Sequence, residues 1–186
     1  MHVILGSHSP RRKELLAALD VEFLTVDIVC NEAYPHSLQA GDIPLYIARE
    51  KADAYRNNIK QNELLITADT IVWLDGKVLG KPKDEEDACR MLRILSGKTH
   101  QVYTGVCLTS LDKQISFVDK TDVSFRKLAE EEIQYYVRKY KPLDKAGAYG
   151  IQEWIGMTAC TGINGSYFNV MGLPVHRVAE EMRKFG

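Results

Sequence analysis

The stretch Leu64-Leu65-Ile66-Thr67-Ala68-Asp69 contains the run of residues that decides the fold. A short and nearly continuous apolar run of this kind is typical of a strand that is buried in the centre of a sheet. Asp69 follows the run directly, and in open α/β sheets the carboxyl ends of the strands form the edge that binds ligands. Asp69 is therefore a candidate functional residue. The alternative is an ordinary turn residue at the end of a strand.

Strands and helices are expected to alternate on both sides of this central strand. Asp75-Gly76 is a two-residue hairpin signal between short strands at 71–74 and 77–79. Six of the 13 glycines lie from Gly147 to Gly172, which predicts a segment of turns and close backbone approaches. The other expected strands are residues 2–5, 22–26, 100–109 and 114–125; the expected helices are 10–19, 42–58, 84–95, 129–140 and one that starts at Pro174. This order predicts an α/β fold in one domain over residues 1–186, with a mixed sheet flanked by helices on both faces.

The composition excludes several classes of function. The chain has 186 residues, with 24 Lys+Arg against 25 Asp+Glu, so no overall basic field exists that could hold nucleic acid. An anionic ligand must instead meet a local cluster of cations. No apolar run approaches the length of a membrane span or a signal peptide, and the four cysteines form no C-x-x-C pair. We therefore expect a cytoplasmic protein without a membrane or nucleic-acid partner.

The first candidate anion site is the segment Gly6-Ser7-His8-Ser9-Pro10-Arg11-Arg12. It joins a strand to a helix, with Ser9 as the N-cap and Pro10 at the first helical position. Arg11 and Arg12 then oppose the helix dipole, each at a cost of about 0.3–1 kcal/mol. Their place makes physical sense if a strong anion binds the free N–H groups of that helix end. The alternative is two exposed arginines beside an ordinary cap.

Two lysines and one glutamate add weaker signals. Lys51 shares a helix face with Ala48, Ala52 and Tyr55, so its ammonium either reaches a ligand or extends along the apolar face to solvent. Lys81 is held between Gly80 and Pro82, just after the hairpin. Glu32 lies in an irregular loop and by itself indicates only a solvated carboxylate.

Together these segments resemble the Maf family of nucleoside triphosphate pyrophosphatases over nearly the whole chain. The order and spacing of the short motifs carry the resemblance, which implies a fold similar to that of the ITPases, with a substrate cleft. The motifs are Ser7-His8-Ser9-Pro10-Arg11-Arg12, Ala48-Arg49-Glu50-Lys51-Ala52, Ala68-Asp69-Thr70, Gly80-Lys81-Pro82, Leu95-Ser96-Gly97, Val102-Tyr103-Thr104-Gly105, Asp144-Lys145-Ala146-Gly147-Ala148-Tyr149-Gly150-Ile151-Gln152, Ile163-Asn164-Gly165-Ser166-Tyr167 and Val170-Met171-Gly172-Leu173-Pro174.

The resemblance implies hydrolysis of a nucleoside triphosphate to a monophosphate and pyrophosphate, and it assigns roles to single residues. Asp69 matches the proton acceptor, while Glu32, Lys51 and Lys81 match the other catalytic residues. Glu32 and Asp69 would hold a divalent cation, Mg²⁺ or Mn²⁺. The phosphate-binding signature includes Ser7, Ser9 and Arg12. A homodimer is also implied.

Base preference is implied by three positions, Arg11, Thr70 and Gln152. Arginine, threonine and glutamine resemble the branch that acts on dTTP and UTP, whereas the branch acting on 7-methyl-GTP carries tryptophan, glutamine and glutamate there. A different base preference and a non-catalytic nucleotide-binding regulator of septum formation remain the alternatives; the regulator would not need Asp69.

The sequence departs from the family pattern at two places. His8 stands where a small or polar residue is more common. The segment from Val26 to Pro35 lacks the tight Asp-Glu pair usual there, so Asp27 is not assumed to replace Glu32 as a metal ligand.

Overall fold

The central strand β3 runs over Glu63–Leu74 and is longer than the sequence indicated. In the computed structural model, which describes residues 1–186, β5 (Thr99–Thr109) pairs antiparallel with β3 from Leu65 to Trp73. The prediction that the strand ends before Asp69 was wrong, because this ladder continues past Asp69. Asp69 therefore lies within a strand and does not follow one.

The opposite edge of β3 is interrupted beside Asp69. The parallel strand β1 (His2–Gly6) pairs with β3 only as far as Thr67. The short antiparallel strand β4 (Lys77–Leu79) begins to pair at Val72, after the predicted turn at Asp75-Gly76. Residues 68–71 consequently have no strand partner on this side, and a gap opens in the sheet at Asp69.

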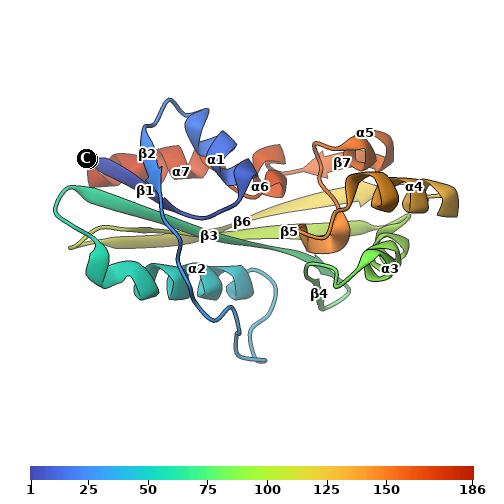
Figure 1. Cartoon of the computed structure of the whole chain (residues 1–186), viewed down its shortest axis with the longest axis horizontal. Coiled ribbons are helices and arrows are strands. Elements are labelled where there is room, and N and C mark those ends of the chain that lie inside the picture. The colour runs from blue at the N-terminus through green and yellow to red at the C-terminus, as the bar shows by residue number, and fades with distance from the viewer.

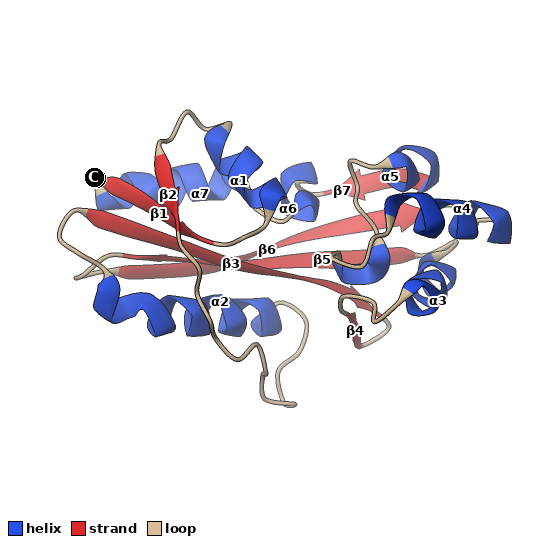
Figure 2. Ribbon diagram, in the orientation of Figure 1, coloured by secondary structure: helices blue, strands red, loops and turns tan.

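The sheet is mixed and has seven strands, in the order β2-β1-β3-β5-β6-β7 with β4 attached to β3. The remaining strands are β2 (Phe23–Thr25), β6 (Gln114–Phe125) and β7 (Cys160–Asn164). Figure 1 shows α2 along one face of the sheet and α1, α6 and α7 along the other, while α3, α4 and α5 gather at one end. The predicted architecture of a mixed sheet with helices on both faces is confirmed (Figure 2).

Most of the helices follow the sequence prediction. The glycine-rich segment is the exception, because it contains two short helices and a strand (α5, β7 and α6) where only turns were expected. These elements have five or six residues each, too few for a hydrophobic period to show. The helices are α1 (Pro10–Ala17), α2 (Asp42–Tyr55), α3 (Glu85–Leu95), α4 (Glu130–Tyr140), α5 (Trp154–Ala159), α6 (Tyr167–Met171) and α7 (Val175–Met182); 3-10 turns cover Arg56–Asn58, Ala146–Ala148 and Arg183–Phe185.

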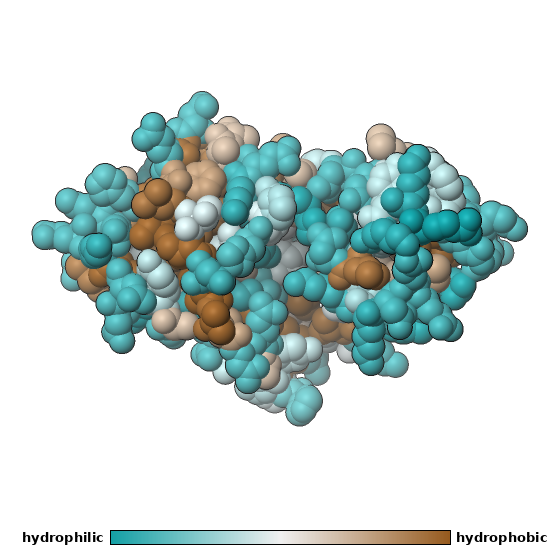
Figure 3. All heavy atoms as spheres, in the orientation of Figure 1, coloured by the Kyte–Doolittle hydropathy of each residue, from teal (hydrophilic) through white to brown (hydrophobic).

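Apolar side chains lie on both faces of the sheet, and a few remain exposed. The main core includes Leu5, Leu16 and Val178 on the side of α1 and α7, and a smaller cluster with Ala48 and Leu65 lies under α2. Figure 3 shows hydrophobic side chains on the surface over β2 and the segment after it; Leu24 and Val29 are 70% and 89% exposed. No helix of the structure is both long and apolar enough to cross a membrane.

Gly105 sets how closely α2 approaches the sheet. A Cβ atom at this position of β5 would lie 2.4 Å from the carbonyl of Pro44 and from the backbone nitrogen of Leu45. Because both obstructing groups are backbone, they cannot rotate away, and Gly105→Ala must push α2 off the sheet. We expect this variant to lose about 1–3 kcal/mol of unfolding free energy, the usual cost of overpacking. Urea denaturation measures this loss. An unchanged denaturation midpoint would show that α2 can accommodate the added methyl group.

Candidate active site

A cleft of about 740 Å³ lies at the gap beside Asp69. Its walls come from the loop between β1 and α1, from the segment between β2 and α2, from α2, from β3, from the turn after β4 and from the glycine-rich segment. Every site residue expected from the sequence lines this one cleft. They are Ser7, Ser9, Arg11, Arg12, Glu32, Lys51, Asp69, Thr70, Lys81 and Gln152.

Lys51 joins two carboxylates, and we call Glu32, Lys51 and Asp69 the Asp69 cluster. The Lys51 Nζ atom lies 3.0 Å from Asp69 Oδ1 and 2.8 Å from Glu32 Oε1. The Lys51 side chain is only 12% exposed, so it does not extend to solvent along the helix face. The helical spacing noted in the sequence therefore places this ammonium inside the cleft, against the β3 carboxylate.

The two carboxylates of the Asp69 cluster have opposite pKa shifts. Burial raises the pKa of Asp69 above its ordinary value, although the charges of Lys51 and Arg12 oppose the rise. The hydrogen bond from Lys51 lowers the pKa of Glu32, which is 56% exposed. Asp69 is thus the more basic carboxylate of the pair. A buried carboxylate with a raised pKa is suited to accept a proton at near-neutral pH.

The guanidinium of Arg12 is held on three sides. Its Nε donates to the carbonyl oxygen of Gly172 over 2.8 Å, its Nη2 to Thr70 Oγ1 over 3.0 Å and its Nη1 to Ser7 Oγ over 3.4 Å. The Thr70 hydroxyl also lies 2.9 Å from Thr104 Oγ1. Burial lowers the pKa of Arg12, but an arginine keeps its proton in proteins. Arg12 is therefore a fixed positive charge with a set orientation.

Helix α1 begins as the sequence predicted. The Ser9 hydroxyl accepts from the backbone N–H of Arg12 over 3.4 Å, and Pro10 occupies the first turn. The Ser7 hydroxyl accepts from the Ser9 N–H over 3.2 Å. Both hydroxyls therefore order the loop that directs the start of the helix toward the cleft.

A second charged group lies where the glycine-rich segment lines the cleft, and we call Arg11, Asp144, Lys145 and Glu153 the Lys145 cluster. The Arg11 Nη1 atom lies 3.2 Å from Asp144 Oδ2. Lys145 contacts Asp144 and Glu153. Gln152 lines the cleft beside these residues, and its Oε1 atom is buried without a hydrogen-bond partner. A buried acceptor without a partner is rare in a folded protein, which marks Gln152 as a candidate for a functional contact.

Lys81 and Arg12 are the cleft cations without a carboxylate in direct contact. Lys81 is exposed, lines the cleft, and its charge contributes to the lowered pKa of Glu32. Arg11 and Lys51, in contrast, each form an ion pair. The cleft therefore holds positive charge that the protein leaves uncompensated, as a polyanion site requires.

The two departures from the family pattern contact each other. His8 Nε2 lies 2.6 Å from Asp27 Oδ1, and both side chains are well exposed. Asp27 thus pairs with His8. No sequence spacing predicts this pair, because its members lie on different segments and only the tertiary fold brings them together.

A divalent cation would find two carboxylates here. Glu32 and Asp69 converge on one ammonium, while no group of three or more His, Cys, Asp or Glu residues is placed to hold a metal by itself. Mg²⁺ usually binds through one or two carboxylates together with substrate phosphates and water. The donor set therefore fits a cation that arrives with a phosphorylated ligand.

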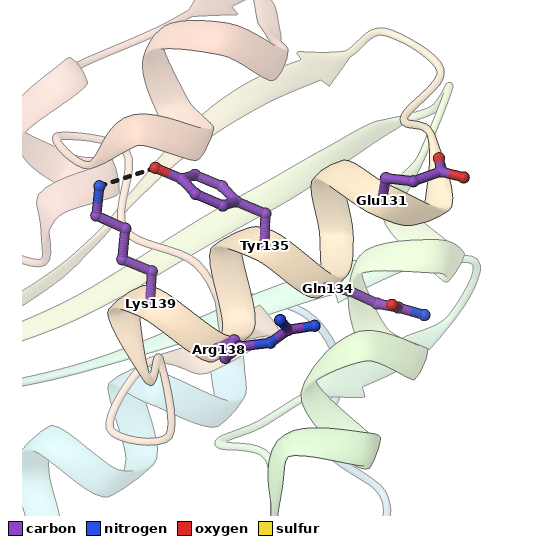
Figure 4. A pocket seen from close by; sticks show the side chains of 5 residues that line it. All are labelled: Glu131, Gln134, Tyr135, Arg138 and Lys139. Atoms are coloured by element: carbon purple, nitrogen blue, oxygen red, sulfur yellow. Dashed lines mark hydrogen bonds between the residues drawn. The ribbon is translucent and has the colours of Figure 1, made fainter.

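A smaller hollow of about 390 Å³ lies on the outer face of α4, away from the cleft (Figure 4). All of its lining residues come from this one helix, and Lys139 Nζ donates to the Tyr135 hydroxyl over 2.8 Å. Lys139 and Tyr135 thus pair with each other, while Figure 4 shows Gln134 and Arg138 directed away from that pair, so the side chains do not converge on one point.

Known proteins match the chain along almost its full length. The family described as "Maf-like protein" matches residues 2–185. A dTTP/UTP pyrophosphatase of Phocaeicola vulgatus is 60% identical over 183 residues, covering 98% of this chain and 95% of that protein. One of Bacteroides thetaiotaomicron is 57% identical with the same coverage. The solved structure of the Ham1 protein of Staphylococcus aureus, only 12% identical, has the same fold with a TM-score of 0.54 over 100% of both chains. The chain belongs to the Maf family.

Proposed function

We propose that this protein is a nucleoside triphosphate pyrophosphatase that hydrolyses dTTP and UTP to the nucleoside monophosphate and pyrophosphate. The observation that carries the proposal is the convergence of Arg12, Lys51 and Lys81 with Asp69 in one cleft. Relatives named dTTP/UTP pyrophosphatase, identical to this chain at 60% and 57% of aligned positions, support the reaction and the base preference.

The test is a panel of nucleoside triphosphates with identified products. We expect UTP and dTTP to give monophosphate and pyrophosphate, and CTP, GTP and ATP to react more slowly. Release of inorganic phosphate in place of pyrophosphate would overturn the reaction class. Preferred turnover of a purine nucleotide would overturn the base preference alone.

In this mechanism Asp69 orients a water molecule and accepts its proton as the water attacks the α-phosphorus. Burial and the raised pKa of Asp69 favour that proton transfer. Lys51, in contact with Asp69, holds the carboxylate in place and adds positive charge beside the attacked phosphate. Arg12 and Lys81 compensate the charge that builds up on the leaving pyrophosphate. Most of the rate enhancement then comes from positioning and electrostatics, and no covalent intermediate is needed.

We propose that Glu32 and Asp69 hold Mg²⁺ or Mn²⁺ when substrate is bound. The cation would polarise phosphate oxygens and lower the pKa of the attacking water. Chelation with EDTA is expected to abolish turnover, and added Mg²⁺ or Mn²⁺ to restore it. Glu32→Gln should raise the metal concentration that gives half-maximal rate, by about tenfold. Full activity in EDTA would contradict the proposal.

Gln152 recognises the base in this proposal. Its amide can accept from N3–H and donate to O4 of uracil or thymine, and its buried Oε1 atom has no other partner. Gln152→Glu replaces the donor with a negative charge. We expect kcat/KM for UTP and dTTP to fall about 10–100-fold relative to the other nucleotides. Unchanged relative rates across the nucleotide panel would remove Gln152 from base recognition.

Thr70 acts beside Arg12 in this scheme. Its hydroxyl contacts Arg12 Nη2 and Thr104 Oγ1 and so supports the phosphate-binding arginine, while its part in base preference stays a prediction from the family resemblance.

The homodimer stays a prediction from the family resemblance, and the cytoplasmic location stays a prediction from the sequence pattern. The exposed apolar side chains over β2, among them Leu24 and Val29, support self-association. Light scattering during gel filtration measures the oligomeric state, and a monomeric mass at micromolar concentration would contradict the dimer.

A further inference from the structure

Lys145 is an unusual residue in this fold because it is charged and buried. It is 8% exposed, less than any other lysine or arginine of the chain. Burial of an ammonium is costly unless partners compensate the charge. The proposed chemistry at Asp69 makes no use of Lys145, so its burial calls for another explanation.

Two carboxylates compensate the charge of Lys145. One of them also contacts Arg11, and the other is linked to the backbone beside Gln152. The Lys145 Nζ atom lies 2.8 Å from Asp144 Oδ1 and 3.1 Å from Glu153 Oε1. The second oxygen of Asp144 accepts from Arg11 Nη1 over 3.2 Å. Burial acts against the ionised form of Asp144, but Lys145 and Arg11 outweigh it and lower its pKa. Arg11 is thereby tied to the glycine-rich segment by a charged bridge.

The second oxygen of Glu153 is linked through Tyr136 to the backbone just before Gln152. It accepts a short hydrogen bond from the Tyr136 hydroxyl, and that hydroxyl accepts from the Gly150 N–H over 3.1 Å. Burial and the bond to Glu153 raise the pKa of Tyr136, so its hydroxyl keeps the proton that it donates. Gly150 and Glu153 flank Gln152 on both sides. The residues on both sides of Gln152 therefore belong to the hydrogen-bonded network that includes Lys145.

Packing around Gly150 shows how closely this network fits. A Cβ atom on Gly150 would lie 2.9 Å from Glu153 Cδ and 3.1 Å from Lys145 Cε. The segment can approach the ion pair only because residue 150 has no side chain.

We propose that Lys145 is a positioning residue for base recognition, holding Arg11 and Gln152 in one arrangement through Asp144 and Glu153. This inference rests on the proposed function, in which Gln152 reads the base. While the network fixes the glycine-rich segment, the Gln152 amide accepts from N3–H of uracil or thymine. Once the network is broken, the amide can turn and donate to N3 of cytosine, which has no hydrogen there. Lys145 then governs the choice between UTP and CTP without touching the reacting phosphate.

The test is the ratio of kcat/KM for UTP to kcat/KM for CTP in Lys145→Met. Both constants are measured on the same preparation, so a partly unfolded fraction cancels in the ratio. We expect the ratio to fall about tenfold, with a raised KM for UTP and a smaller change in kcat. Tyr136→Phe removes the hydroxyl that joins Glu153 to the Gly150 N–H, leaves both ion pairs of Lys145 in place, and should lower the ratio in the same direction. Lys98→Met breaks a surface ion pair with Asp75 and should leave the ratio unchanged.

The double variant separates positioning from a general packing effect. In a Gln152→Ala background, Lys145→Met should leave the UTP-to-CTP ratio where Gln152→Ala has set it. A wild-type ratio in Lys145→Met, or an equal further fall in the Gln152→Ala background, would overturn the proposal. Dissociation constants for UTP and CTP, measured by calorimetry, test the same discrimination through binding alone. Absence of pyrophosphate release would thus overturn the proposed function, while the binding ratio still decides the role of Lys145.

Discussion

Asp69→Asn is expected to lower kcat for UTP by about 10²–10⁴, the usual effect of losing a general base. Asparagine has nearly the same shape and can still receive the hydrogen bond from Lys51, so the cleft keeps its form. It cannot take a proton from water at neutral pH. Steady-state kinetics of pyrophosphate release measures the effect, and KM should change much less than kcat.

The stability of this variant separates chemistry from folding. Because burial raises the pKa of Asp69, the folded protein disfavours the ionised side chain, and a neutral amide removes that cost. Asp69→Asn should therefore melt no lower than the wild type. Asp75→Asn is the matched control in the exposed hairpin turn and should retain full activity. Near-normal turnover by Asp69→Asn would show that another group accepts the proton.

Arg12→Lys is expected to reduce kcat/KM for UTP by about 10²–10³, although the positive charge is retained. The planar guanidinium of Arg12 contacts Gly172, Thr70 and Ser7 at once. A lysine ammonium is a compact charge on a flexible stem and cannot reproduce this three-sided fit. The phosphates would then meet a mobile cation in place of a fixed one.

The matched control for Arg12→Lys is Arg90→Lys. Arg90 forms an exposed ion pair with Asp87 on α3, outside the cleft. We expect that substitution to change neither kinetic constant, since exposed pairs of this kind contribute little. Equal activity of Arg12→Lys and wild type would show that charge alone, without orientation, is enough at this position.

Local signals in the sequence accounted for most of the elements around the cleft. The Ser9 cap with Pro10 predicted the start of α1, and Asp75-Gly76 predicted the hairpin; the structure confirms both. Lys51 was ambiguous because helical spacing tells which face a residue occupies and nothing about what covers it. The partner of Lys51 is Asp69, 18 positions along the chain, and only the tertiary fold brings the two together.

Long-range pairing explains what the sequence could not predict. Strand β3 passes through Asp69 because β5 supplies a ladder, and the local residues alone favoured a turn there. The Lys145 cluster unites Arg11 with Asp144, which lie 133 positions apart, so no sequence spacing could predict it. The short elements α5, β7 and α6 owe their form to neighbours in space, since five or six residues carry too weak a periodic signal.

The three long strands pair without a break, β3 with β5 from Leu65 to Trp73 and β5 with β6 from Thr99 to Thr109. Rotating one end of the molecule against the other would break this shared hydrogen-bonded ladder, so the fold has no hinge across the cleft. We therefore expect any rearrangement on nucleotide binding to lie in the segments between these strands, such as the irregular stretch that carries Glu32. A liganded crystal should accordingly superpose on the free protein throughout the sheet and differ mainly there.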